Sequence, residues 1–248
     1  MPRQAREKSR SGIYHIMLRG INRQAIFEDE EDNLKFLETL KTYKAISEYK
    51  VFAYCLMSNH IHLLLQVGKE DLDLIMKRIA GSYVYWYNWK YYRRGHLFQD
   101  RYKSEPVEDE KYFLTVLRYI HQNPQKAGIV KELGKYKFSS YNEILMENKK
   151  LIDIDFIYSM IYREDFIRFC NEPNSDKCLE YDESDGRLSD ADAIKVIQKI
   201  SKCRNASEFA KLEVKKRDQY ISKLKEEGLS IRQISRLTGI SFGIVRRL

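Results

Sequence analysis

The sequence lacks any apolar run long enough to cross a bilayer. A membrane-spanning helix needs about 20 apolar residues, and no such run occurs in the 248 residues. Residues 1–10 are basic, but the apolar core of a signal peptide does not follow them. We therefore expect a cytoplasmic protein that is not secreted and has no membrane partner.

Cysteine is also scarce, and the cysteines are scattered. Cys55, Cys170, Cys178 and Cys203 form no Cys-x-x-Cys pair. A zinc knuckle needs such close spacing, and a disulfide framework needs an oxidising compartment. The pattern argues against both and fits a reducing cytosol.

What the chain has in excess is positive charge. It contains 44 Lys and Arg against 36 Asp and Glu, a net charge of +8, and 43% of its residues are hydrophobic. A chain of this length and composition can bury the core of one or two globular domains. The positive charge favours a polyanionic partner, and nucleic acid more than a membrane surface.

The charge is unevenly distributed. Eight acidic residues lie in 172–192, whereas residues 195–248 carry 14 Lys and Arg against 5 Asp and Glu, a local charge of +9. We interpret the acidic stretch as part of a linker. The sequence thus predicts an N-terminal domain at 1–145, a helical extension and acidic linker at 146–192, and a basic C-terminal domain at 193–248.

Apolar periodicity predicts the elements of the first domain. In order, they are a strand at 12–19, a helix at 29–49, a hairpin at 50–67, a helix at 71–92, a strand or extended loop at 95–104 and a helix at 111–121. Pro124 disfavours helical geometry at Asn123, so we expect the last helix to stop there. This β-α-β-β-α-β-α order predicts an α+β fold, a ferredoxin-like antiparallel sheet with helices on one face.

Residues 230–247 have the pattern of a helix, a glycine turn and a second helix. An ordinary helical hairpin would show the same pattern, but the basic charge favours a small all-α helix-turn-helix domain that binds duplex DNA. The candidate DNA contacts there are Arg232, Arg236, Arg246 and Arg247.

Two histidines in the hairpin are candidate metal ligands. His60 and His62 stand two apart in a strand, so their side chains point to the same face. This spacing suits two imidazoles on one ion, although a pair of packed histidines would look alike. Tyr119 and Asn123 share one helix face. They could supply a nucleophilic hydroxyl and an amide-oxygen ligand. His15 and His96 fit a structural or DNA-contacting role.

Residues 83–94 are dense in aromatics and end in Arg93 and Arg94. One interpretation is that the rings form a core stripe. The other is a surface that stacks bases and binds phosphates of single-stranded nucleic acid. Both can hold, because different faces of the helix are involved.

Four segments resemble, in order, the HUH-type single-tyrosine transposases, and most closely their IS200-like, REP-associated branch. They are residues 19–27, 57–63, 95–103 and 118–128, within a resemblance that covers about residues 10–145. The resemblance implies Mg²⁺ or Mn²⁺ on His60 and His62, completed by Asn123, where many members have glutamine. It further implies that Tyr119 attacks single-stranded DNA beside a hairpin and forms a 5′-phosphotyrosine.

By the same resemblance, further residues are expected to contact DNA: Arg19, Asn22, Arg23, Arg101 and Lys103. Two alternatives stay open. One is a domesticated DNA-binding regulator of repeated palindromic elements that has lost strand transfer, and the other is a metal nuclease that uses water. The resemblance allows a monomer or a homodimer.

Overall fold

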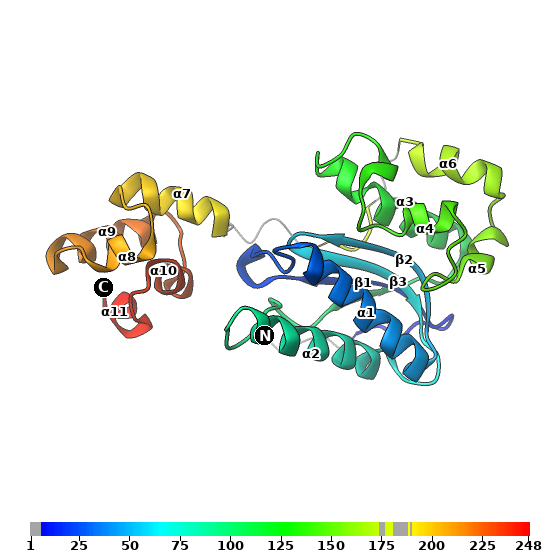
Figure 1. The fold of residues 1–248 in the computed structure, drawn as a ribbon, viewed down its shortest axis with the longest axis horizontal. Helices are drawn as coiled ribbons and strands as arrows, with labels where there is room; N and C mark the ends of the chain where they lie inside the picture. Colours follow the sequence, from blue (N-terminus) through cyan, green and yellow to red (C-terminus); the bar gives the residue numbers. More distant parts are fainter. Residues whose placement is uncertain (1–5, 174–176, 181–187, 189) are drawn as a thin grey trace. The chain divides into compact units, whose positions relative to one another are not determined.

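The chain folds into two compact units, as the computed structural model in Figure 1 shows for residues 6–173, 177–180, 188 and 190–248. One unit comprises residues 1–20 and 25–180, and the other comprises residues 21–24 and 181–248. Of the expected acidic linker, residues 174–176, 181–187 and 189 lie outside the described residues.

The first unit is built on a four-stranded antiparallel sheet. Its strands are β1 (Ile13–Arg19), β2 (Lys50–Met57), β3 (His60–Gln66) and β4 (Lys103–Pro106), in the order β2-β3-β1-β4. Ser58 and Asn59 form the tight turn between β2 and β3, as predicted. The predicted α+β class and ferredoxin-like sheet are confirmed.

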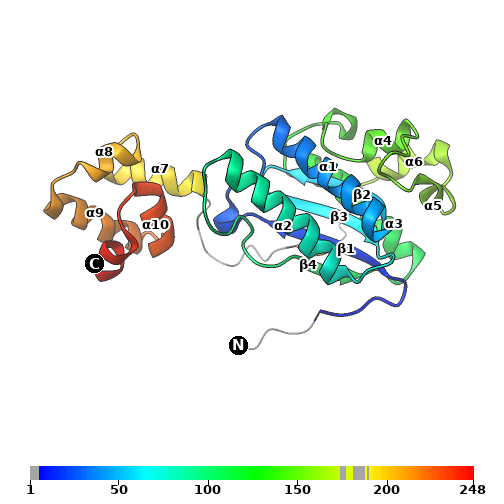
Figure 2. The same ribbon diagram turned by 60° about the horizontal axis from the view of Figure 1, so that its bottom comes forward.

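Helices α1 (Glu30–Ser47) and α2 (Leu72–Lys90) cover one face of the sheet (Figures 1 and 2). Helix α1 begins at a capping box, in which Asp29 and Asp32 satisfy each other's backbone N–H groups. Phe27, Phe36 and Tyr83 pack edge to face or tilted, with ring centroids 5.2–5.8 Å apart. These rings join α2 to α1 and to the loop before it.

Helix α3 (Glu110–Lys126) lies against the other face of the sheet (Figures 1 and 2). The prediction of helices on one face only is therefore wrong, because α3 packs its buried side, including Tyr119, against the face that carries His15 and His62.

The predicted stop at Asn123 is wrong, because α3 continues through Pro124 to Lys126. Proline removes a single backbone hydrogen bond here, in the last turn, where its cost is small. The Ala127 N–H still donates to the Asn123 carbonyl at 2.9 Å. Asn123 is therefore held within a regular helix.

The chain after α3 adds to the core of the same unit. Helices α4 (Tyr141–Leu145), α5 (Ile154–Tyr158) and α6 (Arg163–Asn171) follow. Ile157 and Phe166 are fully buried in the cluster that contains the sheet. The Gln122 side chain of α3 donates to the Cys170 carbonyl at 2.8 Å. These contacts tie α6 to the helix that carries Tyr119.

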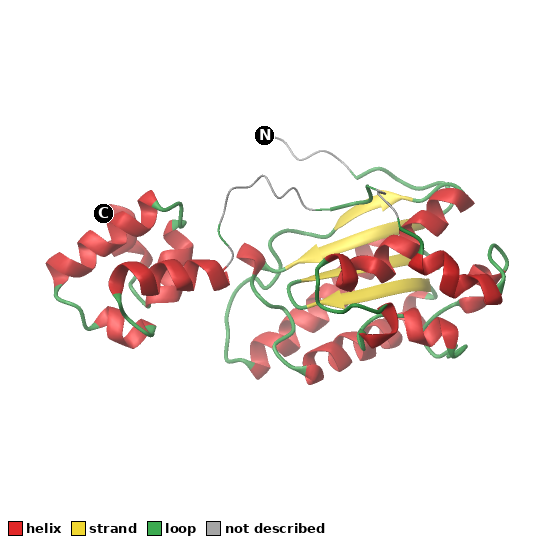
Figure 3. Cartoon of the chain, turned by 90° about the horizontal axis from the view of Figure 1, so that it is seen from above, coloured by secondary structure: helices red, strands yellow, loops and turns green. Residues whose placement is uncertain are grey.

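The second unit is all-helical where the structure describes it (Figure 3). Its helices are α7 (Asp190–Ser201), α8 (Ala206–Ala210), α9 (Val214–Glu226), α10 (Ile231–Thr238) and α11 (Phe242–Arg247). Helix α10 ends at Gly239, whose φ of 73° is the left-handed conformation that favours glycine at a helix end. The predicted helix, glycine turn and helix are present.

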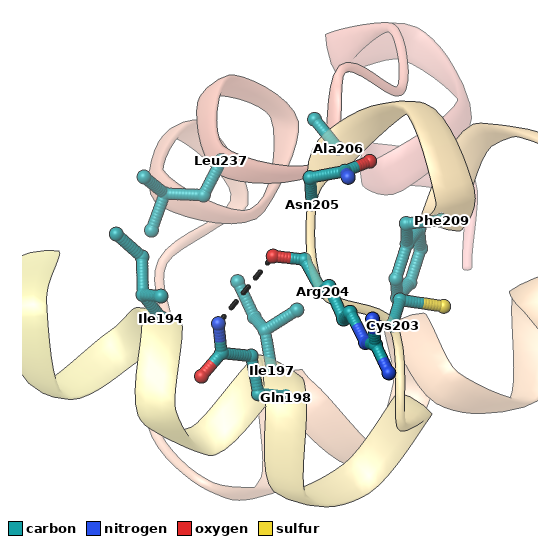
Figure 4. Close-up of a pocket in the computed structure, with 9 residues that line it drawn as sticks. All are labelled: Ile194, Ile197, Gln198, Cys203, Arg204, Asn205, Ala206, Phe209 and Leu237. Atoms are coloured by element: carbon teal, nitrogen blue, oxygen red, sulfur yellow. Dashed lines mark hydrogen bonds between the residues drawn. The ribbon is translucent and has the colours of Figure 1, made fainter.

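A pocket of about 160 Å³ lies inside this unit (Figure 4). Ile194 and Ile197 of α7, Phe209 of α8 and Leu237 of α10 give it an apolar wall. At its edge the Gln198 amide donates to the Arg204 carbonyl at 3.4 Å.

Among the described residues, no helix of either unit is long and apolar enough to span a membrane.

Candidate catalytic site

The two faces of the sheet differ in chemistry. Directly opposed residues of antiparallel strands point to the same face, and the register pairs Arg19 with His60 and Met17 with His62. His15 shares this face through strand alternation. On this face the Tyr119 ring of α3 lies 5.9 Å from that of His15 and 5.7 Å from that of His62, whereas the intervening residues, such as Ile16 and Leu63, point to the opposite face. The polar face is therefore the one that meets α3.

The structure brings the four predicted site residues together. The His62 ring centroid lies 5.2 Å from that of His60 and 5.7 Å from that of Tyr119. The Asn123 side chain is a hydrogen-bond partner of His60. It also donates to the Tyr119 carbonyl at 3.0 Å. A strand of the sheet and one face of α3 thus supply two imidazoles, an amide and a phenol to one place.

Neighbouring groups fix the orientation of both imidazoles. His60 Nδ1 lies 2.7 Å from the Asn59 Oδ1, an oxygen that only accepts, so Nδ1 carries the proton and Nε2 keeps a lone pair. His62 Nδ1 lies 3.0 Å from His15 Nε2. The other ring nitrogen of His15, Nδ1, is buried and has no hydrogen-bond partner among the described residues. Such outer contacts are typical of metal-ligating histidines.

Burial keeps these imidazoles neutral. It lowers the pKa of His15 to about 3 and that of His60 to about 4, the latter with help from the Arg19 charge. Burial and the two neighbouring histidines hold the pKa of His62 well below its usual value. Because a metal ion binds the neutral ring, all three are in the form that can act as ligand or as ligand support at neutral pH.

Tyr119 is 2% exposed, and its hydroxyl donates a hydrogen bond to Glu180 Oε1. Burial first, and then this carboxylate, raise the pKa of Tyr119 above its ordinary value. The Lys103 ammonium holds the backbone of the same residue, donating to the Glu180 carbonyl at 3.3 Å. In this arrangement the phenol keeps its proton at neutral pH.

The predicted DNA contacts fall in several places. Arg19 is only 9% exposed and donates to the Gln99 side chain at 3.0 Å, beside His60. Lys103 pairs with Met17 and so belongs to the polar face of the sheet, and Arg101 is exposed nearby in sequence. Asn22 and Arg23 lie in the 3₁₀ helix Ile21–Arg23, with left-handed φ angles of 52° and 57°.

The predicted contacts in the second unit are arginines of α10 and α11. Arg232, Arg246 and Arg247 are exposed. Arg236 instead joins α10 to α7, since its guanidinium donates to both carboxylate oxygens of Asp190, with one distance of 2.7 Å. This ion pair gives Arg236 a structural role between the two helices, which is an alternative to the predicted contact with DNA.

Sequence reasoning missed two members of the site, His15 and Glu180. Strand alternation offered a signal for His15, because it stands four residues before Arg19 in the same strand. Nothing local pointed to Glu180, which is 61 residues from Tyr119. Within the described part of the chain, no group of three or more His, Cys, Asp and Glu side chains is placed to hold an ion. The candidate ion site consists of two imidazoles and an amide.

Comparisons with known proteins found similar sequences and a similar fold. The family model described as "Transposase IS200 like" matches residues 8–123. A Haemophilus influenzae protein assigned to the REP-associated tyrosine transposases is 29% identical over an alignment of 120 residues, and the match covers 42% of this chain and 68% of that protein. The fold is similar to that of a REP-associated tyrosine transposase solved bound to a REP hairpin. The TM-score is 0.52 at 18% identity, over 62% of this chain and 90% of that one.

Proposed function

We propose that this chain, whose residues 8–123 match the IS200-like transposase family model, cleaves and rejoins single-stranded DNA through a phosphotyrosine on Tyr119. The substrate we propose is a strand beside a hairpin-forming repeat, as in the hairpin complex of the structural relative. The observation that carries the proposal is the meeting of Tyr119 with His60, His62 and Asn123 on the polar face of the sheet.

The side chains fit the Mg²⁺ or Mn²⁺ on which this family generally depends. His60 and His62 are neutral, and Asn59 and His15 orient them from behind. With the Asn123 amide oxygen they would form the protein's share of the coordination sphere. A divalent ion bound there would withdraw charge from the oxygens of the scissile phosphate.

The chemistry of Tyr119 follows from the position of its hydroxyl. Its oxygen forms a bond to phosphorus, and the bond from phosphorus to the 3′ oxygen breaks, which leaves a 5′-phosphotyrosine and a 3′-hydroxyl. Because burial raises the pKa of Tyr119, its hydroxyl enters the step protonated. The phenolic proton leaves as the bond to phosphorus forms, and the 3′ oxygen takes up a proton as it departs. The new phosphodiester keeps the energy needed to rejoin DNA, so the cycle requires no ATP.

A labelled hairpin oligonucleotide, incubated with protein and Mg²⁺ or Mn²⁺ and run on a denaturing gel, tests the proposal. A covalent adduct that chelator prevents is the expected result. Cleavage without an adduct would instead mean that water is the nucleophile. Binding without either product would identify a DNA-binding regulator. The hydrogen bond between Tyr119 and Glu180 favours that alternative, since it engages the nucleophile.

His15→Phe is expected to weaken Mn²⁺ binding by about 10- to 100-fold, because it removes the partner that orients His62. Isothermal titration of the DNA-free protein measures this affinity. His96→Ala is the matched control, since His96 is exposed. An unchanged affinity in His15→Phe would show that His62 needs no orientation from His15.

For the second unit we propose binding of duplex DNA through α10 and α11. The exposed arginines and the local charge of +9 in residues 195–248 support this role. If the second unit binds duplex DNA in this way, the first unit would be the transposase domain and the second a helix-turn-helix domain.

Replacing Arg246 and Arg247 together by glutamine is expected to lower the salt dependence of duplex binding. If each guanidinium contacts one phosphate, the slope of log K against log salt falls by about 2. Fluorescence anisotropy at several salt concentrations measures the slope. Lys199→Gln, an exposed substitution on α7, is the control. Equal slopes for the wild type and the double variant would contradict the assignment.

A further inference from the structure

Helix α2 and the turn after it carry a row of three solvent-exposed aromatic side chains, Tyr85, Trp89 and Tyr92. Tyr85, Trp89 and Tyr92 are 80%, 71% and 98% exposed. Tyr85 and Trp89 stand four apart, with Tyr92 three further on, which places the rings on one side of the helix and of the turn that ends it. Tyr83 and Tyr87, on the opposite side, are buried in the core. Neighbouring large rings left in solvent in this way mark an interaction surface.

The turn that presents the last ring is specifically built. Tyr92 has a φ of 50°, a conformation that residues with large side chains rarely adopt. The Arg93 N–H donates to the Asn88 carbonyl at 2.8 Å, and the Asn88 amide donates to the Gly95 carbonyl at 3.0 Å. A left-handed residue just after a helix is a common way for the helix to end, and here it fixes the direction in which Tyr92 leaves α2.

The charge at this end of α2 suits a polyanion. Arg93 and Arg94 directly follow the rings, and Arg94 is exposed. Acidic side chains at the same end already have partners: the Lys90 ammonium lies 2.8–2.9 Å from the carboxylates of Asp29, Glu31 and Asp32, and Glu28 accepts a hydrogen bond from the Tyr87 hydroxyl at 3.3 Å. The row therefore combines aromatic faces with positive charge, as surfaces that bind single strands do.

The row is anchored to the end of the sheet that holds His60. The Tyr83 hydroxyl donates to the Ile26 carbonyl at 2.5 Å, and the Ile26 N–H donates to the Ser58 carbonyl, in the turn before His60, at 2.7 Å. Beyond the row, the Gln99 N–H donates to the Arg19 carbonyl at 2.8 Å. Arg19 is the register partner of His60. Both ends of the segment are thus tied to the end of the sheet where His60 lies, while α2 itself covers the face opposite to α3.

We propose that Tyr85, Trp89 and Tyr92 stack the bases of the unpaired DNA that extends from the cleavage site, with Arg93 and Arg94 on its phosphates. This inference rests on the proposed function, since it states how the same substrate is held. Four helical residues rise about 6 Å, close to twice the 3.4 Å between stacked bases. A base can therefore lie between neighbouring rings.

The chain has two tryptophans, Trp86 and Trp89, which makes the proposal testable by fluorescence. In Trp86→Phe the remaining tryptophan is Trp89, in the row, and in Trp89→Phe it is the half-buried Trp86. The probe is unpaired oligothymidine of about 12 nucleotides, within the length that a single-strand site covers. We expect DNA to quench the emission of Trp89 and to leave that of Trp86 nearly unchanged.

Alanine at Tyr85, Trp89 or Tyr92 is expected to weaken binding of the same probe by about tenfold. These side chains are exposed, so the variants keep the core intact. Tyr162→Ala is the matched control, because Tyr162 is 78% exposed at the start of α6 and outside the row. Its affinity for the probe should equal that of the wild type.

Unquenched Trp89 emission at saturating probe overturns the inference, even if wild-type protein forms the Tyr119 adduct. A change in Trp89 emission that follows protein concentration without DNA overturns it too, because the row would then be a contact between copies of the chain. Quenching in a protein that forms no adduct upholds the stacking surface and counts against strand transfer. The two proposals therefore fail separately.

Discussion

Tyr119→Phe is expected to abolish the covalent attachment of the protein to DNA and to leave hairpin binding intact. The substitution removes the oxygen that we propose attacks phosphorus, so adduct formation should fall by at least about a thousandfold. The ring itself remains packed against His15 and His62, whose centroids lie 5.9 and 5.7 Å from its own. The loss is therefore one of chemistry, not of fold. A denaturing gel and a binding titration with the same oligonucleotide measure the two effects.

Tyr112→Phe is the matched control for this result. Tyr112 lies on the same helix, seven residues earlier, and its hydroxyl likewise has a carboxylate partner, Glu105. Its removal should leave the adduct unchanged. If the adduct persisted in Tyr119→Phe, another residue would have to be the nucleophile, and the proposed site would be wrong.

His60→Ala is expected to reduce cleavage by at least about a hundredfold, because the ion that we propose stabilises charge on the phosphate would lose a ligand. Mn²⁺ titration should show the corresponding loss of ion binding. His60 is half-buried at the start of β3, so alanine there leaves a smaller cavity than it would at the fully buried His62. Melting temperatures of the variant and the wild type check that the fold is retained.

Tyr119→Phe is the control for ion binding in His60→Ala, because it removes the proposed nucleophile and keeps both imidazoles. It should bind Mn²⁺ like the wild type although it makes no adduct. Equal Mn²⁺ affinity and equal cleavage in His60→Ala would place the ion elsewhere in the protein.

Local rules predicted the parts of the site that lie within one element. Alternation along a strand predicted that His60 and His62 share a face, and helical periodicity did the same for Tyr119 and Asn123. The turn at Ser58 and Asn59 followed from its composition. The same kind of rule failed at Pro124, because the missing hydrogen bond lies in the last turn, where a helix tolerates it.

The remaining parts depend on contacts that no local pattern records. His15 meets His62 across 47 residues of sequence, and Glu180 meets Tyr119 across 61. Glu180 also lies in a stretch whose composition indicated only a linker. Which acidic residue of that stretch reaches the tyrosine is decided by how the chain returns to the sheet after α6.

The two faces of the sheet differ in polarity, and this difference affects how such proteins can evolve. The face under α1 and α2 is apolar and supplies packing, whereas the face under α3 buries His15 and His62, imidazoles whose removal from water opposes folding. Apolar replacements there sacrifice chemistry but spare stability, the trade-off expected where function and folding make different demands. A gene copy released from selection for cleavage can lose its histidines by drift and still encode a folded protein.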